Sequence, residues 1–116
     1  MCSSDLEVLG AIRYQRNEAV LHTDIRMLPR RRRAWAAWNY HVLPRSSAAP
    51  VAVSYNMNIL QGLKTPSPLI VTLNRSDDID PTCVLRRVTY HHPLFTVGSI
   101  AAQARQREIN GARRTY

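Results

Sequence analysis

The residues best suited to chemistry by type and spacing are four consecutive arginines, Arg30–Arg33, followed closely by Trp35 and Trp38. Guanidinium groups neutralise phosphates, and indole rings offer faces on which nucleobases stack. The stretch therefore predicts either a nucleic-acid-binding patch or a solvated or partner-facing turn before a buried strand. The turn is favoured, because Lys64 is the only lysine among 16 basic residues and the other arginines are scattered along the chain.

Imidazole groups could in principle hold zinc, and the chain has four histidines: His22, His41, His91 and His92. They lack clustered cysteine or carboxylate partners, so no metal site is predicted. Cys2 and Cys83 are far apart, which indicates free thiols in a reducing compartment. Asp77, Asp78 and Asp80 lie in a polar segment where aspartate caps the backbone, and no catalytic residue is assigned.

The composition is that of one globular domain. The chain has 116 residues, of which 45% are hydrophobic and 21% are charged, and its net charge is +8. These values exclude a disordered or fibrous class. Neither a run of about 20 apolar residues nor a secretory signal is present. We therefore expect a cytoplasmic or membrane-peripheral protein without a transmembrane span.

Three helical segments and six strands are expected from periodicity and end signals. The helical segments are residues 7–14, 56–62 and 100–108, with Ser99 as the cap of the last one and Gly111 as its stop. The strands are residues 18–23, 34–43, 51–55, 69–74 and 83–90, and one that starts at Arg113. The pattern predicts an α+β fold with a mixed or antiparallel sheet and a few short helices.

Residues 34–43 alternate over their whole length and carry aromatic bulk on both faces. Trp35 lies on one face, and Trp38 and Tyr40 lie on the other. We therefore expect a strand that is covered on two sides.

Several ordered strings resemble the flavin-containing amine oxidase family: LHTDIRMLPRRRRAWAAWNYHV, VSYNMNILQGL, VTLN, IDP, HPLF, AAQAR and ING. The similarity is to a bacterial branch of FAD-dependent oxidoreductases related to monoamine oxidase, protoporphyrinogen oxidase and phytoene desaturase. It implies that residues 7–116 are a C-terminal-half fragment, mostly the substrate domain of the two-domain FAD-linked fold. The first six residues, MCSSDL, match a translated sequencing adapter and are expected to be a non-native leader; an ordinary N-terminus is the alternative.

The resemblance also implies FAD as the cofactor of the parent protein. The G-x-G-x-x-G fingerprint that places the pyrophosphate on a helix N-terminus is missing. None of the four glycines has that spacing: Gly10, Gly62, Gly98 and Gly111. FAD is therefore not expected to bind the fragment, which should be inactive and poorly soluble alone. Its expected partners are a small-molecule substrate and the FAD-binding segments of the same chain, and not nucleic acid.

The resemblance implies that the HHPLF segment lines the channel near the flavin and substrate, which makes His92, Pro93 and Phe95 candidates. Four further candidates for the substrate channel have aromatic or polar side chains: Trp38, Tyr40, Tyr55 and Asn56. Aromatic rings with polar tips form the walls of mostly apolar sites. Core packing is the alternative for each of them.

The leading functional prediction is a partial FAD-dependent oxidoreductase that transfers hydride from an unknown amine or apolar substrate to flavin. The competing prediction is a small basic nucleic-acid-binding module that uses Arg30–Arg33 with Trp35 and Trp38. A third is a structural or partner-binding domain without chemistry.

Overall fold

The computed structural model describes residues 3–44 and 50–111, which form two compact units. Residues 17–90 form the first, called the sheet unit below. Residues up to 16 and from 91 onward form the second, called the terminal unit. Among the described residues, none of the helices has the length and apolar character needed to cross a membrane.

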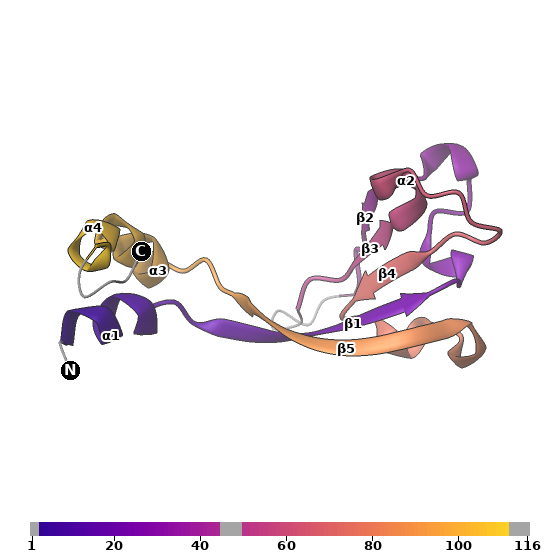
Figure 1. Cartoon of the computed structure of the whole chain (residues 1–116). Helices are drawn as coiled ribbons and strands as arrows, with labels where there is room; N and C mark the ends of the chain where they lie inside the picture. The colour runs from indigo at the N-terminus through magenta and orange to yellow at the C-terminus, as the bar shows by residue number, and fades with distance from the viewer. Residues whose placement is uncertain (1–2, 45–49, 112–116) are drawn as a thin grey trace. The chain divides into compact units, whose positions relative to one another are not determined.

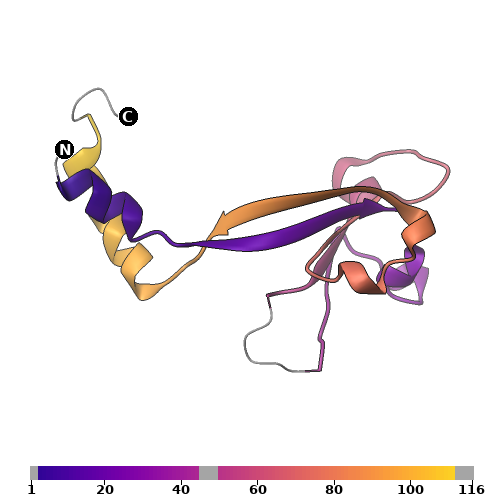
Figure 2. The ribbon, with the colours of Figure 1, turned by 90° about the horizontal axis from the view of Figure 1, so that it is seen from below.

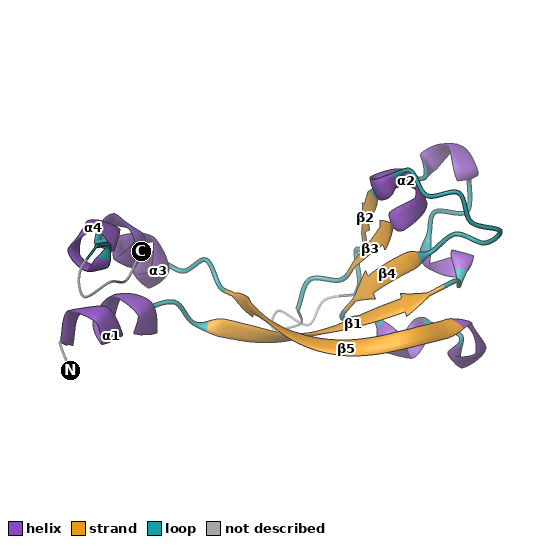
Figure 3. Cartoon of the chain, in the orientation of Figure 1, coloured by secondary structure: helices purple, strands orange, loops and turns teal. Residues whose placement is uncertain are grey.

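A five-stranded sheet is the main feature of the fold (Figures 1 and 3). Its strands are β1 (Tyr14–His22), β2 (Trp38–Tyr40), β3 (Val53–Asn56), β4 (Ile70–Leu73) and β5 (Val84–Pro93), in the spatial order β2-β3-β4-β1-β5. The pairs β1–β4, β3–β4 and β2–β3 are antiparallel. Figure 2 shows β5 alongside β1 at one edge. The predicted α+β class with an antiparallel sheet and short helices is confirmed, while the assignment to an amine oxidase domain stays a prediction.

The strand register places the most deeply buried side chains on one face of the sheet, called the inner face below. Val20 pairs with Thr72 and His22 with Ile70, while Ser54 and Asn56 of β3 pair with the same two β4 residues. All six of these side chains are less than 2% exposed. Met27 and Ile79, from the segments that follow β1 and β4, pack against Val20 and complete the core.

The alternate residues of the same strands form the opposite face, called the outer face below. On it, β1, β3 and β4 contribute Ala19, Leu21, Val53, Tyr55, Val71 and Leu73. Trp38 and Tyr40 of β2 lie on the same face, and they are 66% and 64% exposed. The expected two-sided coverage of residues 34–43 is therefore wrong.

The strand predicted over residues 34–43 is also too long, because β2 covers only Trp38–Tyr40, with one further backbone bond at each end, Asn56 to Ala37 and His41 to Ala52. The segment before it makes a short 3₁₀ turn at Arg32–Ala34. The Asn39 side chain then accepts from the Ala36 N–H and donates to the Ala36 carbonyl. Such local side-chain bonds compete with a strand ladder and shorten it.

The other predicted strands match the structure with shifted ends. β1 begins at Tyr14, four residues before the predicted start at residue 18, and β5 continues to Pro93. β3 and β4 fall on the predicted runs 51–55 and 69–74. The strand predicted from Arg113 lies outside the described residues.

The short helix α2 (Met57–Gln61) confirms the helical turn predicted over residues 56–62. The Asn56 side chain caps its start, and Gly62 ends it with a positive φ of 65°. Three further 3₁₀ turns connect the strands: Ile25–Met27, Ser76–Asp78 and Pro81–Cys83.

The terminal unit contains α1 (Ser3–Gly10), α3 (Val97–Ala104) and α4 (Gln106–Ile109). The helix predicted over residues 7–14 is confirmed for residues 7–10, but its end is wrong, because α1 stops at Gly10 and the chain enters β1 at Tyr14. The helix predicted over residues 100–108 is divided at Arg105. Its cap is Thr96 rather than Ser99, and the two residues form a reciprocal capping box. The expectation that residues 1–6 are non-native stays a prediction.

Candidate functional site

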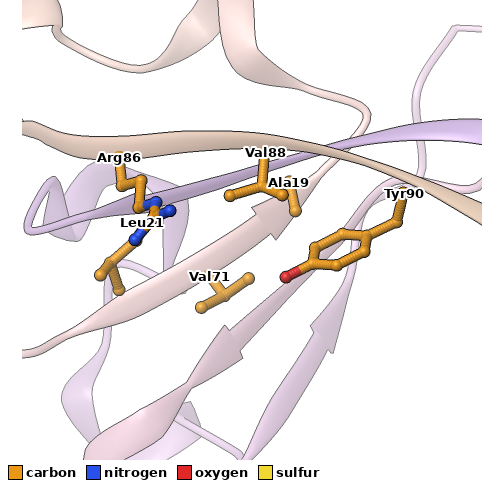
Figure 4. A pocket seen from close by; sticks show the side chains of 6 residues that line it. All are labelled: Ala19, Leu21, Val71, Arg86, Val88 and Tyr90. Atoms are coloured by element: carbon orange, nitrogen blue, oxygen red, sulfur yellow. The ribbon is translucent and has the colours of Figure 1, made fainter.

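The outer face carries a pocket of about 350 Å³ on the β1, β4 and β5 strands (Figure 4). It is lined by Ala19, Leu21, Val71, Arg86, Val88 and Tyr90. Arg86, Val88 and Tyr90 point from β5 toward the apolar side chains of β1 and β4. An apolar wall with a few polar groups is the usual composition of a small-molecule site, and this volume lies at the lower end of that range.

Three of the predicted substrate-channel residues, Trp38, Tyr40 and Tyr55, share this outer face. Trp38 and Tyr55 are direct cross-strand partners, which brings an indole and a phenol together on β2 and β3. The strand order places these residues on the β2 side of the sheet, whereas the pocket is on the β5 side. The face therefore carries an aromatic pair toward one side of the sheet and an apolar pocket toward the other.

The other predicted channel residues lie elsewhere. Asn56 is on the inner face, 1% exposed, and its side chain accepts from the N–H groups of Asn58 and Ile59. The Asn56 side chain is therefore used as the cap of helix α2. His92, Pro93 and Phe95 belong to the terminal unit, where Phe95 is 85% exposed. The structure does not establish these four residues as part of the outer-face site.

Beneath the outer face, the inner face contains a chain of hydrogen bonds that sequence reasoning missed. His22 Nε2 is 2.8 Å from Thr72 Oγ1, which is 2.7 Å from Ser54 Oγ. Ser54 Oγ is in turn 2.7 Å from Nε2 of His41, just beyond β2. The chain crosses β1, β4 and β3, and thus links side chains that are distant in sequence.

The bonds at the two ends of this chain fix the histidine tautomers. The Asp24 backbone N–H donates to His22 Nδ1, and Arg75 donates to His41 Nδ1. Since a backbone amide and a guanidinium can only donate, both Nδ1 atoms are acceptors, and each neutral ring carries its hydrogen on Nε2. Both imidazoles therefore donate toward the central hydroxyls.

This arrangement does not support a nucleophilic serine. In a Ser–His pair that activates the hydroxyl, the imidazole accepts the hydroxyl proton, and a carboxylate at the other ring nitrogen stabilises the resulting cation. His41 has Arg75 at that position instead of a carboxylate. Burial lowers the pKa of both histidines, and the positive charge of Arg75 lowers the pKa of His41 further. The network links β1, β4 and β3 through side-chain hydrogen bonds, and its donor and acceptor arrangement does not match that of an activated serine.

A carboxylate next to this network is bound from several sides. Arg26 donates to both carboxylate oxygens of Asp24, through Nε at 2.9 Å and NH2 at 2.6 Å. The Asp80 N–H donates to Oδ2 at 2.9 Å. The Arg26 bonds are the main reason that the pKa of Asp24 is held far below its usual range. The Asp24 side chain is 4% exposed, so these bonds tie the turn after β1 to the segment after β4.

The arginine run that suggested nucleic acid is exposed at all four positions, Arg30–Arg33. Trp35, however, is engaged within the chain. Its Nε1–H donates to the Pro29 carbonyl at 2.8 Å, and the Arg32 guanidinium lies 5.4 Å from its ring centroid. A base would have to displace that cation–π contact to stack on this side of the ring.

The described residues do not fit FAD. A dinucleotide needs a parallel strand–turn–helix unit with glycines in the turn, whereas the sheet is antiparallel. Gly10 and Gly98 lie within helices, and Gly62 follows one. Likewise, no group of three His, Cys, Asp or Glu residues in the described part of the chain could hold a metal ion.

In comparisons with known proteins, no protein-family model matches the chain, and the search of curated proteins also gave no match.

A sequence signal for the inner network did exist. His22, Ser54 and Thr72 each stand within a strand-like apolar run, at a position where alternation gives one face to polar groups. The sequence pattern does not show which face of the sheet is buried. That follows only from the strand register and the packing of the sheet. For the pocket, Arg86 and Tyr90 carried no distinguishing signal beyond their alternation with Val88.

Proposed function

We propose that this chain forms the substrate-side sheet of an FAD-dependent oxidoreductase of the amine oxidase type. The observation that carries the proposal is the outer face, where Trp38 is 66% exposed beside its partner Tyr55 and an apolar pocket lies on the same face, whereas the other face holds the fully buried side chains. An open apolar face of this kind indicates a contact surface for a ligand or partner. The order of the amine-oxidase-like strings supports the enzyme class.

The proposed reaction class is oxidation of an amine or apolar substrate by hydride transfer to flavin. Flavin supplies the redox chemistry when it is bound. Since the described residues do not fit FAD, their part is confined to the substrate: the outer face orients it and keeps water from its apolar portion. A cytoplasmic location remains a prediction.

The test is to express the longer reading frame that contains this chain, with FAD added during refolding or growth. The proposal expects a yellow protein with flavin absorbance that persists through gel filtration. It also expects the 116-residue chain alone to remain colourless. A longer protein that stays colourless with FAD present would contradict the proposed class.

The nucleic-acid alternative has its own test, because the exposed run Arg30–Arg33 could still contact phosphates. Binding to a fluorescent oligonucleotide would be measured at several salt concentrations, with all four arginines replaced by glutamine as the comparison. Phosphate-driven binding weakens steeply with salt. We expect no difference between the two proteins at physiological salt, and a salt-dependent difference would favour the alternative.

A further inference from the structure

The pocket on the outer face contains one formally charged side chain, Arg86, above an otherwise apolar wall. Ala19, Leu21, Val71 and Val88 provide that wall, and Tyr90 contributes a phenol ring. No carboxylate is among the lining residues. A cationic group held against apolar side chains favours an anion as its partner.

The neighbouring arginine on the same strand shows the contrast. Arg87 points to the inner-face side of β5, where its NH1 is 3.0 Å from Glu18 Oε1. Arg86 makes no ion pair or hydrogen bond with another side chain in the part of the chain that the structure describes. Two adjacent guanidinium groups therefore differ in one respect: Arg87 already has its carboxylate, whereas Arg86 does not.

We infer that this pocket binds an apolar molecule carrying one carboxylate, with Arg86 as the partner of the anion and the β1 and β4 side chains as the wall for the apolar body. As the substrate class of the enzyme, this inference rests on the proposed function; as a binding site, it does not. An ammonium group is disfavoured in this pocket, because it would lie close to a guanidinium with no carboxylate in the lining to balance the two charges.

Three probes with the same apolar body separate the head groups: phenylpropionate, phenylpropanol and phenylpropylamine. Each would be titrated into the isotopically labelled 116-residue chain, and amide and methyl shifts followed by NMR. Phenylpropionate is expected to bind about tenfold or more tightly than the other two, since a charge-assisted hydrogen bond contributes on that scale. Shifts are expected at Leu21, Val71 and Val88. Equal binding of the amine would overturn the inference.

The matched variants are Arg86→Gln and Arg87→Gln. The first is expected to weaken phenylpropionate binding about tenfold or more and to leave phenylpropanol binding unchanged. The second removes the same charge one residue away and is expected to keep the affinity within about twofold, apart from nonspecific screening. Arg86→Lys keeps the charge and should restore part of the affinity. If Arg86→Gln binds like the unmodified chain, the inference is wrong.

Two controls distinguish a loss of folding from a loss of ligand binding. Arg86 is exposed, so the amide spectrum of Arg86→Gln should match that of the unmodified chain away from β5. The oxidoreductase proposal is tested by flavin absorbance and the carboxylate site by phenylpropionate titration, so the two results are read separately. A yellow longer protein whose pocket ignores phenylpropionate would leave the oxidoreductase proposal standing and refute the carboxylate site. A colourless longer protein whose pocket binds phenylpropionate through Arg86 would refute the oxidoreductase proposal and support the carboxylate site.

Discussion

The two faces of the same sheet differ in a way that reverses the usual pattern. On the inner face, four of the six most buried side chains are polar, namely His22, Ser54, Asn56 and Thr72. On the outer face, the aromatic side chains of Trp38 and Tyr40 are 66% and 64% exposed, although Ala19 and Val53 of the same face are buried. Polar groups can be buried here because each has a hydrogen-bond partner. The contrast indicates that the polar layer helps to specify the strand register, while the outer face carries the proposed binding site.

The largest effect is expected from removing the carboxylate that fastens the inner face. Asp24→Ala leaves the Asp80 N–H and the Arg26 side chain without their acceptor. We expect a loss of about 3 kcal/mol in the free energy of unfolding. Urea denaturation measures it, and Asp77→Ala, at an exposed position of the nearby turn, is the control with a change of about 0.5 kcal/mol or less. Equal losses would show that Asp24 does not hold the two segments.

The next effect concerns the hydroxyl pair at the centre of the inner face. Thr72→Val keeps the shape but removes the partner of His22 Nε2 and of Ser54 Oγ. The expected loss is about 2 kcal/mol. Adding Ser54→Ala should cost less than the sum of the single changes, because the two hydroxyls share one bond. Strict additivity in a double-mutant cycle would mean that this bond does not contribute.

The pH dependence of the unfolding free energy tests the buried histidines of the inner face in the unmodified chain. Burial lowers the pKa of His22 and of His41, so the folded chain takes up protons at these rings less readily than the unfolded chain does. Below the ordinary histidine value of about 6.5, the unfolded chain binds protons that the folded chain does not. The free energy of unfolding is therefore expected to fall as pH is lowered from about 6.5 toward the lowered pKa values, and to be level above that range. His22→Gln should reduce the dependence of the unfolding free energy on pH. An unchanged dependence would mean that groups other than His22 cause it.

The smallest effect on stability is expected on the outer face. Trp38→Ser removes a side chain that is already 66% exposed, so the unfolding free energy should change by about 0.5 kcal/mol or less. Urea denaturation measures the change. A loss of several kcal/mol would mean that this face is covered, as the alternation of residues 34–43 had suggested.

Sequence signals from adjacent residues predicted the helix and strand segments that such residues determine. Helix α2 could be predicted because its stop, Gly62, directly follows it, and the structure adds Asn56 as its cap. The strands β3 and β4 were predicted from short β-branched runs. The predicted end of α1 was wrong because strand β1 begins earlier than expected, at Tyr14. The predicted start of α3 was wrong because Thr96, and not Ser99, caps the helix.

The remaining features depended on contacts between distant residues. The bond between His22 and Thr72 spans 50 residues of sequence, and no local pattern contains it. Coverage of the inner face by Met27 and Ile79 is likewise a tertiary event. For the same reason, the aromatic bulk around Trp38 was interpreted as two-sided packing, although nothing in the described sheet unit buries it. The pocket around Arg86 could be located only after β5 was placed beside β1.

The most direct test of the two-face account is solvent paramagnetic relaxation of methyl groups in the 116-residue chain, with a neutral gadolinium chelate in the buffer. The account predicts strong relaxation for Leu21, Val71 and Val88 on the outer face, and little for Val20 and Ile70, which are fully buried on the inner face. Equal relaxation of the two sets, or protection of the outer set, would contradict it.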